Sequence, residues 1–262
     1  MQIKYHLGRR AFLIIALAIV LVGCGTNLHS FTSKSSDSVK VHSIKQNFAN
    51  VFLVNVNGKW LIIDSGHPNK GEKIVEQIKK FGLNVNQIKY LILTHGHPDH
   101  AGNAKFFQSK YGIKIIASEK ENGLINNKGI DTTLCPRGPL GYFANKTAAN
   151  KPYNTFETDI AVKNTFKLSS IGLKGTITGM SGHTDGSLLI EIGNNLFVGD
   201  LIRGSLLNSS KPVYHLFVCD LEENLNHINE VLLSQKANHW YPGHGGMLLK
   251  ADIQKFINKK EG

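Results

Sequence analysis

Three histidines and one aspartate fall within six consecutive positions, in the segment His95-Gly96-His97-Pro98-Asp99-His100. Neutral imidazole nitrogens and carboxylate oxygens are the ligands that suit zinc and iron at near-neutral pH. The segment directly follows the apolar run Tyr90–Leu93, and a strand ending there would hold the loop rigidly. Alternate histidines could then meet one ion, while the aspartate and the last histidine face a second. The spacing predicts a metal site; the alternative is a histidine-rich surface loop.

Three later segments add single histidines or aspartates beside glycine: Ser181-Gly182-His183-Thr184, Phe197-Val198-Gly199-Asp200 and Pro242-Gly243-His244. Glycine lets the backbone turn sharply and approach an ion closely. A catalytic zinc needs three protein ligands and an open position, and two metals need more. Each segment alone could be an ordinary turn. The presence of all three segments in one chain is what indicates further metal ligands.

The order of these motifs resembles the metallo-β-lactamase fold superfamily of hydrolases, over about residues 41–259. The resemblance includes the segment Leu61–Gly66, which ends in Asp-Ser-Gly where the family strand ends in Asp-Thr-Gly. It implies an α/β fold of the four-layer αβ/βα sandwich type. In that fold the site lies at one edge, where both halves contribute loops.

The resemblance also implies two Zn²⁺ ions and a set of ligands. It places seven residues on the ions: His95, His97 and His183 on one, Asp99, His100 and His244 on the other, and Asp200 bridging both. Asp64 would orient a ligand through a hydrogen bond. Asp-Ser-Gly is also a good turn sequence, so Asp64 could equally be a turn residue.

Such a site predicts metal-assisted hydrolysis. Two divalent ions that share one water lower its pKa and give a metal-bridging hydroxide, and one ion also polarises the bond under attack. Asp99 is the candidate for passing a proton from the nucleophile to the leaving group. Aspartate at position 200 resembles glyoxalase II-type thioester hydrolases and lactonases, whereas class B β-lactamases usually carry Cys or Ser there. We therefore expect a substrate with an ester, lactone or related acyl bond.

Three alternatives remain open. One is a β-lactam hydrolase. Another is a persulfide dioxygenase, which resembles this chain but would use a single iron at His95, His183 and Asp200. The third is a non-catalytic metal-binding lipoprotein, which the presence of all seven expected ligands disfavours.

The first 23 residues have the pattern of a signal peptide. A basic stretch containing Arg9 and Arg10 precedes the apolar run Ala11–Val22, which is too short to span a bilayer. The run ends in Leu21-Val22-Gly23-Cys24, which resembles a bacterial lipobox and implies acyl chains on Cys24. An ordinary signal peptide and a twin-arginine export signal are the alternatives.

A lipidated Cys24 would anchor the protein to a bacterial membrane, either the cell membrane or the outer membrane, outside the cytoplasm. Residues 24–40 are rich in serine and threonine and are expected to be a flexible tether for a catalytic domain of residues 41–262. Cys135 and Cys219 could form a disulfide in an oxidising compartment, but the sequence leaves this open.

The formal net charge is +11, and it falls to +8 without the signal peptide, which holds three basic and no acidic residues. The basic residues are scattered, as at Lys70 and Lys79, and form no stripe interleaved with aromatic residues of the kind that single-stranded nucleic acid prefers. We expect a small-molecule substrate and no nucleic-acid partner. The oligomeric state is not predicted.

Hydrophobic spacing predicts the elements that position the site. Helices are expected over residues 70–81, 101–110, 222–233 and 251–259. Strands are expected as a pair within 41–63 turning at Asn57-Gly58, and over 113–118, 168–178, 188–192 and 196–198.

Residues 119–165 are expected to be an irregular flap over the site. The flap offers Arg137, Tyr142 and Phe143 as candidate substrate contacts, and Tyr214 and His215 are two more. All five could equally be ordinary loop residues.

Overall fold

The computed structural model describes residues 29–31, 39–146 and 151–261 of the 262. The predicted signal peptide, Cys24 and most of the predicted tether lie outside the described residues. Within the predicted tether, the described residues His29–Phe31 form strand β1, which pairs antiparallel with the next strand. No helix within the described ranges is long and apolar enough to cross a membrane.

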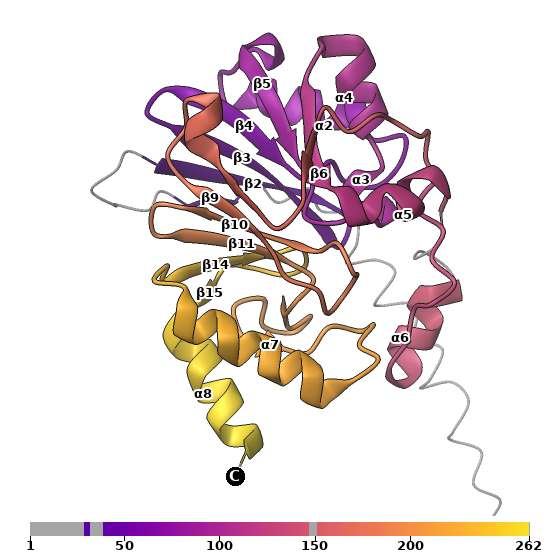
Figure 1. Cartoon of the computed structure of the whole chain (residues 1–262), viewed down its shortest axis with the longest axis vertical. Helices are drawn as coiled ribbons and strands as arrows, with labels where there is room; N and C mark the ends of the chain where they lie inside the picture. Colours follow the sequence, from indigo (N-terminus) through magenta and orange to yellow (C-terminus); the bar gives the residue numbers. More distant parts are fainter. Residues whose placement is uncertain (1–28, 32–38, 147–150, 262) are drawn as a thin grey trace, which may run out of the picture.

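Two sheets make up the middle of the molecule (Figure 1). The first contains, in spatial order, β1, β2 (Val39–Gln46), β3 (Ala49–Val56), β4 (Lys59–Ile63), β5 (Ile88–Ile92), β6 (Lys114–Ser118) and β7 (Ile160–Val162). The second contains β15 (Leu248–Leu249), β14 (His239–Pro242), β11 (Asn195–Gly199), β10 (Leu188–Ile192), β9 (Thr176–Gly179) and β8 (Thr165–Lys167). A short ribbon joins β12 (Arg203–Gly204) to β13 (Pro212–Val213).

Helices cover the outer faces of both sheets (Figure 1). The first half contributes α2 (Gly71–Lys80) and α4 (Ala104–Tyr111) to the outer face of the first sheet. The short helices α3 (Pro98–Ala101), α5 (Asn122–Asn126) and α6 (Gly138–Ala144) belong to connecting segments, and α6 lies away from that face. The second half contributes α7 (Leu221–Ser234) and α8 (Lys250–Glu261). Short 3-10 helices are η2 (Val85–Gln87), η3 (Glu119–Glu121) and η5 (Leu168–Ile171).

Three apolar clusters hold these layers together. Between the sheets, the ring of Phe52 meets that of Phe197 with centroids 5.2 Å apart. Buried Ile74 of α2 and Phe107 of α4 belong to the cluster on the outer face of the first sheet. Ile228 of α7 belongs to the cluster on the outer face of the second. Burial of apolar surface on both faces of each sheet gives the order helix, sheet, sheet, helix, which confirms the predicted αβ/βα sandwich.

Some predicted elements were wrong in detail. Residues 41–63 form parts of three strands instead of a pair, because a second tight turn follows β2, where Asn47 adopts a positive φ of 60°. The strand predicted over residues 168–178 is interrupted by η5. There Ser170 Oγ donates a hydrogen bond to Lys167 O, and Gly172, at φ 73°, ends the turn. The predicted helix 101–110 is divided into α3 and α4, and the predicted flap contains α5, α6 and β7.

Candidate metal centre

The histidine-rich loop follows β5 and is fixed to the end of the neighbouring strand β4. Asp64, fully buried at that end, accepts hydrogen bonds from Thr94 N at 2.8 Å and from Thr94 Oγ1 at 3.0 Å. Ser65 donates to the carbonyl of His100 through its backbone N at 2.6 Å and through its Oγ at 2.9 Å. Because β4 and β5 are parallel, their carboxyl ends meet at one sheet edge, and the loop is held at both of its ends.

Asp64 also contacts a predicted ligand directly. Its Oδ2 lies 2.8 Å from His100 Nδ1, and both side chains are fully buried. With Nδ1–H donated to the carboxylate, the Nε2 lone pair of His100 points into the site. Asp64 reaches this position with a left-handed backbone at φ 60°, which Asp tolerates better than most residues.

The other four predicted histidines follow the same pattern, with one ring nitrogen held from outside the site. The outer partners are Thr94 Oγ1 for His95 Nδ1 at 3.1 Å, Asp131 Oδ2 for His97 Nε2 at 2.9 Å, Phe217 O for His183 Nδ1 at 3.3 Å, and Phe48 O for His244 Nδ1 at 2.8 Å. Each partner can accept an N–H, so each ring turns a lone pair inward.

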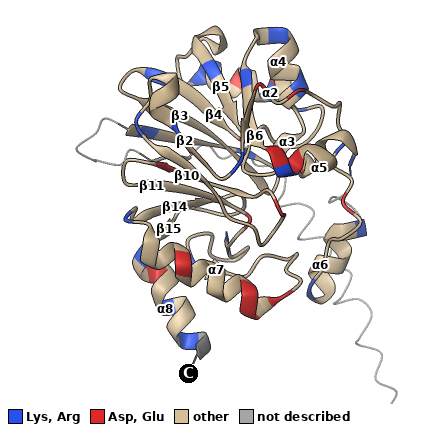
Figure 2. Cartoon of the chain, viewed as in Figure 1, with Lys and Arg blue, Asp and Glu red and all other residues tan. Residues whose placement is uncertain are grey.

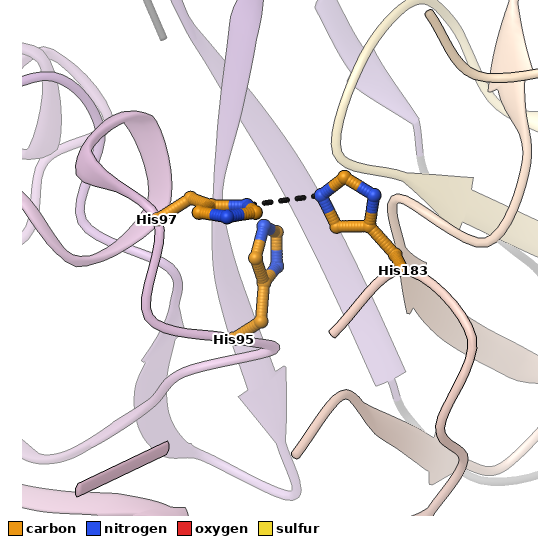
Figure 3. A group of neighbouring side chains, drawn as sticks. All are labelled: His95, His97 and His183. Atoms are coloured by element: carbon orange, nitrogen blue, oxygen red, sulfur yellow. Dashed lines mark hydrogen bonds between the residues drawn. The ribbon is translucent and has the colours of Figure 1, made fainter. Parts of the chain in front are cut away.

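The inward nitrogens of His97 and His183 lie 3.0 Å apart, with His95 beside them (Figure 3). Two lone pairs at that separation repel each other unless a cation or a proton lies between them. The ligand atoms of these three histidines all lie within 4.8 Å of one another. The group therefore fits a metal ion that accepts three nitrogen ligands.

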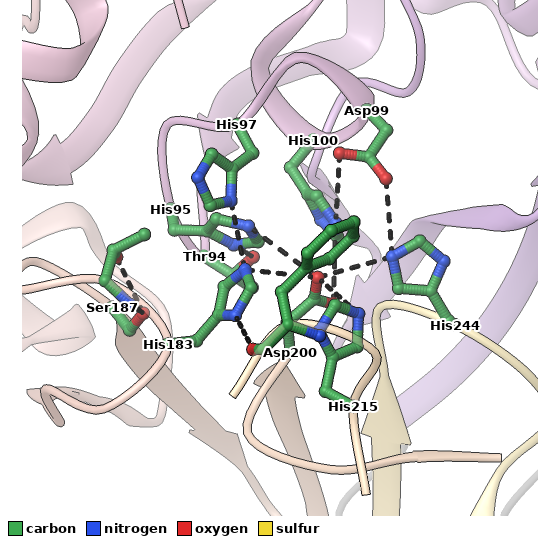
Figure 4. Close-up of polar contacts among 12 residues, drawn as sticks. Thr94, His95, His97, Asp99, His100, His183, Ser187, Asp200, His215 and His244 are labelled. Carbon is green, nitrogen blue, oxygen red and sulfur yellow. Dashed lines mark hydrogen bonds and ion pairs between the residues drawn. The ribbon is translucent and has the colours of Figure 1, made fainter. Parts of the chain in front are cut away.

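Asp200 lies at the centre of the site (Figure 4). Its Oδ1 is 3.5 Å from His100 Nε2, and its Oδ2 is 3.5 Å from His183 Nε2 and 3.3 Å from His244 Nε2. Asp99 Oδ2 is 3.3 Å from the same nitrogen of His244. The described atoms include three here that are buried without a hydrogen-bond partner: His95 Nε2, His100 Nε2 and Asp200 Oδ1. This donor set fits two divalent cations that share Asp200.

The ionisation of the site also suits cations. Burial lowers the pKa of His183 to about 4, which favours the neutral imidazole that a metal needs. Burial acts in the same direction on His244, but the carboxylates of Asp200 and Asp99 outweigh it and raise that pKa to about 10. They also hold the pKa of His100 well above its usual value. Cations would replace these two protons, so metal binding should release protons.

Glycine permits the close approach of the second-half loops. A Cβ on Gly243 would lie 2.4 Å from Asp200 Oδ1 and 2.4 Å from His100 Cε1, so the segment carrying His244 passes the site as backbone alone. Gly199, immediately before Asp200, has a positive φ of 50° at a register shift between β11 and β14. This backbone conformation lets the strand end turn toward the site.

Glu121, which was not predicted from the sequence, joins the two ligand loops. Its side chain is buried, with Oε2 accepting from Gly96 N at 2.6 Å and Oε1 accepting from Gly186 N at 2.9 Å. Gly96 separates His95 from His97, and Gly186 follows His183 by three residues. The local sequence Glu119-Lys120-Glu121-Asn122 is charged and polar, which is typical of an exposed turn, so it gave no sign that Glu121 is buried.

His215 was predicted only as a candidate substrate contact, and the structure buries it within the site. Its Nε2 lies 3.1 Å from Asp200 Oδ2, and its ring meets those of His183 and His244 with centroids 4.8 and 5.3 Å apart (Figure 4).

The other four candidate substrate contacts lie elsewhere. Arg137 caps the start of α6, on which Tyr142 and Phe143 are 60% and 61% exposed. The ring of Tyr214 packs against Phe256 of α8, with centroids 5.0 Å apart. Contact between these four residues and a substrate stays a prediction.

A cavity of about 420 Å³ opens beside His183 and is lined mainly by polar residues, among them Asp131 and Asp185. Cys135 and Cys219 also line it, and they form a disulfide with Cα atoms 4.9 Å apart. The structure thus answers the pairing question that the sequence left open. The cavity is large enough for a small organic molecule next to the first group of histidines.

Comparisons with known proteins agree with this geometry. The sequence model of the metallo-beta-lactamase superfamily matches residues 44–215. The beta-lactamase-like protein 2 homolog of Drosophila melanogaster is 25% identical over 219 residues, covering 80% of this chain and 64% of that one. The hydroxyacylglutathione hydrolase GloC of Haemophilus influenzae is 36% identical over 61 residues, covering 23% and 26%.

The chain spans only part of such relatives: the matches cover between 26% and 66% of the curated proteins' own lengths. Among solved structures, the DIM-1 metallo-beta-lactamase is similar with a TM-score of 0.59 at 19% identity, covering 90% of this chain and 99% of that one. At that identity the likeness shows the fold alone.

Proposed function

The chain belongs to the metallo-beta-lactamase superfamily, and from that membership we propose that it is a dinuclear zinc hydrolase of an ester, lactone or related acyl bond. The observation that carries the proposal is that five inward imidazole nitrogens and the carboxylates of Asp99 and Asp200 form neighbouring groups of possible ligands, with three buried atoms left without partners. A scaffold without a metal would bear the cost of those buried polar atoms for no gain.

The proposed ligands fall into two groups that share Asp200. One ion would be held by His95, His97 and His183, and the other by Asp99, His100 and His244. Two bound divalent ions would lower the pKa of the water between them and polarise the acyl carbonyl. The site therefore requires neither a serine nor a cysteine nucleophile.

Asp99 is the residue that we propose moves the proton. Its carboxylate is held by His244 at 3.3 Å, and His100 Nε2 lies 3.7 Å from its other oxygen. The side chain is 21% exposed, whereas that of Asp200 is 3% exposed, so Asp99 is the carboxylate of this pair that a substrate can reach. It would accept a proton from the attacking water and deliver it to the leaving oxygen, sulfur or nitrogen.

The proposal of an acyl substrate has two supports: the aspartate at position 200 and the similarity to one curated hydrolase. Aspartate there resembles thioester hydrolases and lactonases, and the similarity to a hydroxyacylglutathione hydrolase supports the same class. The solved β-lactamases share the fold at 16–20% identity, which does not extend to their substrates. The second group of ligands, Asp99, His100 and His244, is complete. Its presence favours a site with two ions over the single iron of a dioxygenase.

We further propose that the protein acts outside the cytoplasm, anchored through acyl chains on Cys24. The disulfide between Cys135 and Cys219 supports an oxidising compartment. Among the described residues, Lys and Arg are spread over several elements (Figure 2), and this scatter supports a small-molecule substrate over nucleic acid.

The proposed activity predicts metal-dependent turnover of acyl substrates. Purified protein incubated with a panel of esters, lactones, thioesters and β-lactams should hydrolyse at least one of the first three classes. Dialysis against a chelator should abolish that turnover, and added zinc should restore it, because the ions supply the nucleophile and polarise the carbonyl. Turnover that survives complete chelation would rule out the mechanism, and turnover of β-lactams alone would correct the substrate class.

A further inference from the structure

His215 differs from the other five histidines of the histidine cluster, which we define as His95, His97, His100, His183, His215 and His244. In the other five, the outward nitrogen faces a group that can accept an N–H. In His215 the outward nitrogen, Nδ1, instead accepts a hydrogen bond from the backbone N–H of Phe217 at 3.3 Å. Its lone pair is therefore directed away from the site.

This contact assigns the tautomer. A neutral imidazole carries one N–H, and an Nδ1 that accepts from a backbone amide leaves the proton on Nε2. The Nε2–H of His215 points at Asp200 Oδ2, 3.1 Å away. That is shorter than the 3.3 Å and 3.5 Å distances from the same oxygen to His244 Nε2 and His183 Nε2.

Phe217 sets opposite tautomers in two neighbouring rings. Its carbonyl accepts from His183 Nδ1–H at 3.3 Å, which leaves the Nε2 lone pair of His183 free. Its N–H donates to His215, which leaves Nε2 of that ring as a donor. One peptide segment thereby makes one imidazole a ligand and the adjacent one a hydrogen-bond donor.

The segment that contains Phe217 is linked to residues 135–137 by three contacts. Cys219 is bonded to Cys135, and Arg137 N donates to Leu216 O at 2.8 Å. A β-bridge between Phe217 and Pro136 lies between these two links. The three links fix residues 216–219 against residues 135–137. We therefore expect the orientation of His215 to depend on the disulfide-linked segment 135–137 as well as on the burial of its own ring.

We propose that His215 is not an eighth metal ligand but a positioning residue, whose Nε2–H holds the Asp200 carboxylate in the orientation that serves both ions. With Oδ2 fixed by this hydrogen bond, Oδ1 is left facing His100 Nε2 at 3.5 Å. The inference rests on the proposed two-metal function, and it adds a residue that sets the geometry of the shared ligand. Groups that orient metal ligands typically contribute ten- to a hundredfold to metal affinity or activity.

The test compares zinc binding by the full-length protein and the variants His215→Ala and His215→Gln, with His239→Gln as a histidine control on β14. At saturating zinc, His215→Ala should still bind as many ions as the wild type, with affinity about ten- to a hundredfold weaker in competition with a chelating dye. His215→Gln should recover most of the affinity, because its amide N–H can donate to Asp200. The control should match the wild type.

Other outcomes would overturn the proposal. If His215→Ala loses one bound ion at saturation, His215 is a ligand. If its affinity is unchanged, the hydrogen bond does not position Asp200. Nitrogen NMR of labelled histidine in the metal-free protein gives a readout independent of metal: a proton on Nδ1 of His215 would contradict the assignment. Absence of metal from the wild type would instead contradict the proposed function, and the NMR result would still decide the tautomer.

The disulfide's part in this arrangement can be isolated with a double-mutant cycle. The paired variant Cys135→Ser/Cys219→Ser should weaken zinc binding in the same direction as His215→Ala, and it should add little when combined with it, because both act through Asp200. Fully additive effects would show that the disulfide does not act through His215.

Discussion

Replacing Asp99 by asparagine should lower kcat for hydrolysis by about a hundredfold to ten-thousandfold, the usual contribution of a general acid–base group. Asparagine keeps the shape of the side chain and an oxygen that can accept from His244, which lies 3.3 Å from Asp99 Oδ2. It cannot carry a proton from the attacking water to the leaving group. The measurement is kcat on the best acyl substrate with zinc content determined on the same sample.

The zinc content separates the two roles proposed for Asp99. Loss of kcat with the metal retained supports proton transfer, whereas loss of both reflects ligation alone. Asp252→Asn is the control, because Asp252 lies on α8, its side chain is 41% exposed, and it belongs to neither ligand group nor the cavity. Unchanged turnover in Asp99→Asn would contradict the proposed proton path.

Replacing Glu121 by glutamine should destabilise the protein, although Glu121 is not a proposed metal ligand. Both carboxylate oxygens accept a backbone N–H, from Gly96 and from Gly186. A glutamine amide has one oxygen and one NH₂ group, so one buried N–H would face another donor. An unsatisfied buried donor costs about 1–3 kcal/mol, and more where the lost partner is charged.

This cost predicts a melting temperature lower by about 2–12 °C, since 1 kcal/mol corresponds to about 2–4 °C in a domain of this size. Zinc affinity should fall as well, because the same two bonds join the loop of His95 and His97 to the loop of His183. Thermal unfolding of the metal-free protein measures the first effect separately from the second. Glu119→Gln, an exposed substitution in the same 3-10 helix, is the control. Equal melting temperatures for the two variants would contradict the role given to Glu121.

The loop of His95 and His97 could be located from the sequence because its signal is local. Several ligands stand within six positions directly after an apolar strand, and glycine marks Asp200 and His244 as strand-end residues. The αβ/βα layering also followed from the family's motif order. The ligand loop and the strand ends depend on residues that are neighbours in the chain, and the layering on the order of short motifs. Both kinds of signal can be identified in the sequence alone.

Other features depend on contacts between distant segments. Glu121 reaches Gly186, 65 residues away, and His215 is defined by its distance to Asp200 and by the amide of Phe217. The spacing of residues in the sequence does not predict contacts between segments this far apart. The disulfide between Cys135 and Cys219, which are 84 residues apart, could not be predicted for the same reason. The error at Asn47 arose because this polar residue takes a positive φ with no glycine beside it to indicate a turn.

Seven side chains are proposed to hold two metal ions, and the metal content of the purified protein checks this number without any assumption about the substrate. Mass spectrometry of the protein purified without added metal should find about two zinc ions per chain, and His100→Ala should lower that number while leaving the first group of histidines able to bind. A single iron per chain would contradict the two-metal hydrolase and favour a dioxygenase, for which oxygen uptake is the next assay. A chain that binds no metal, even when zinc is supplied, would contradict the proposed metal site itself.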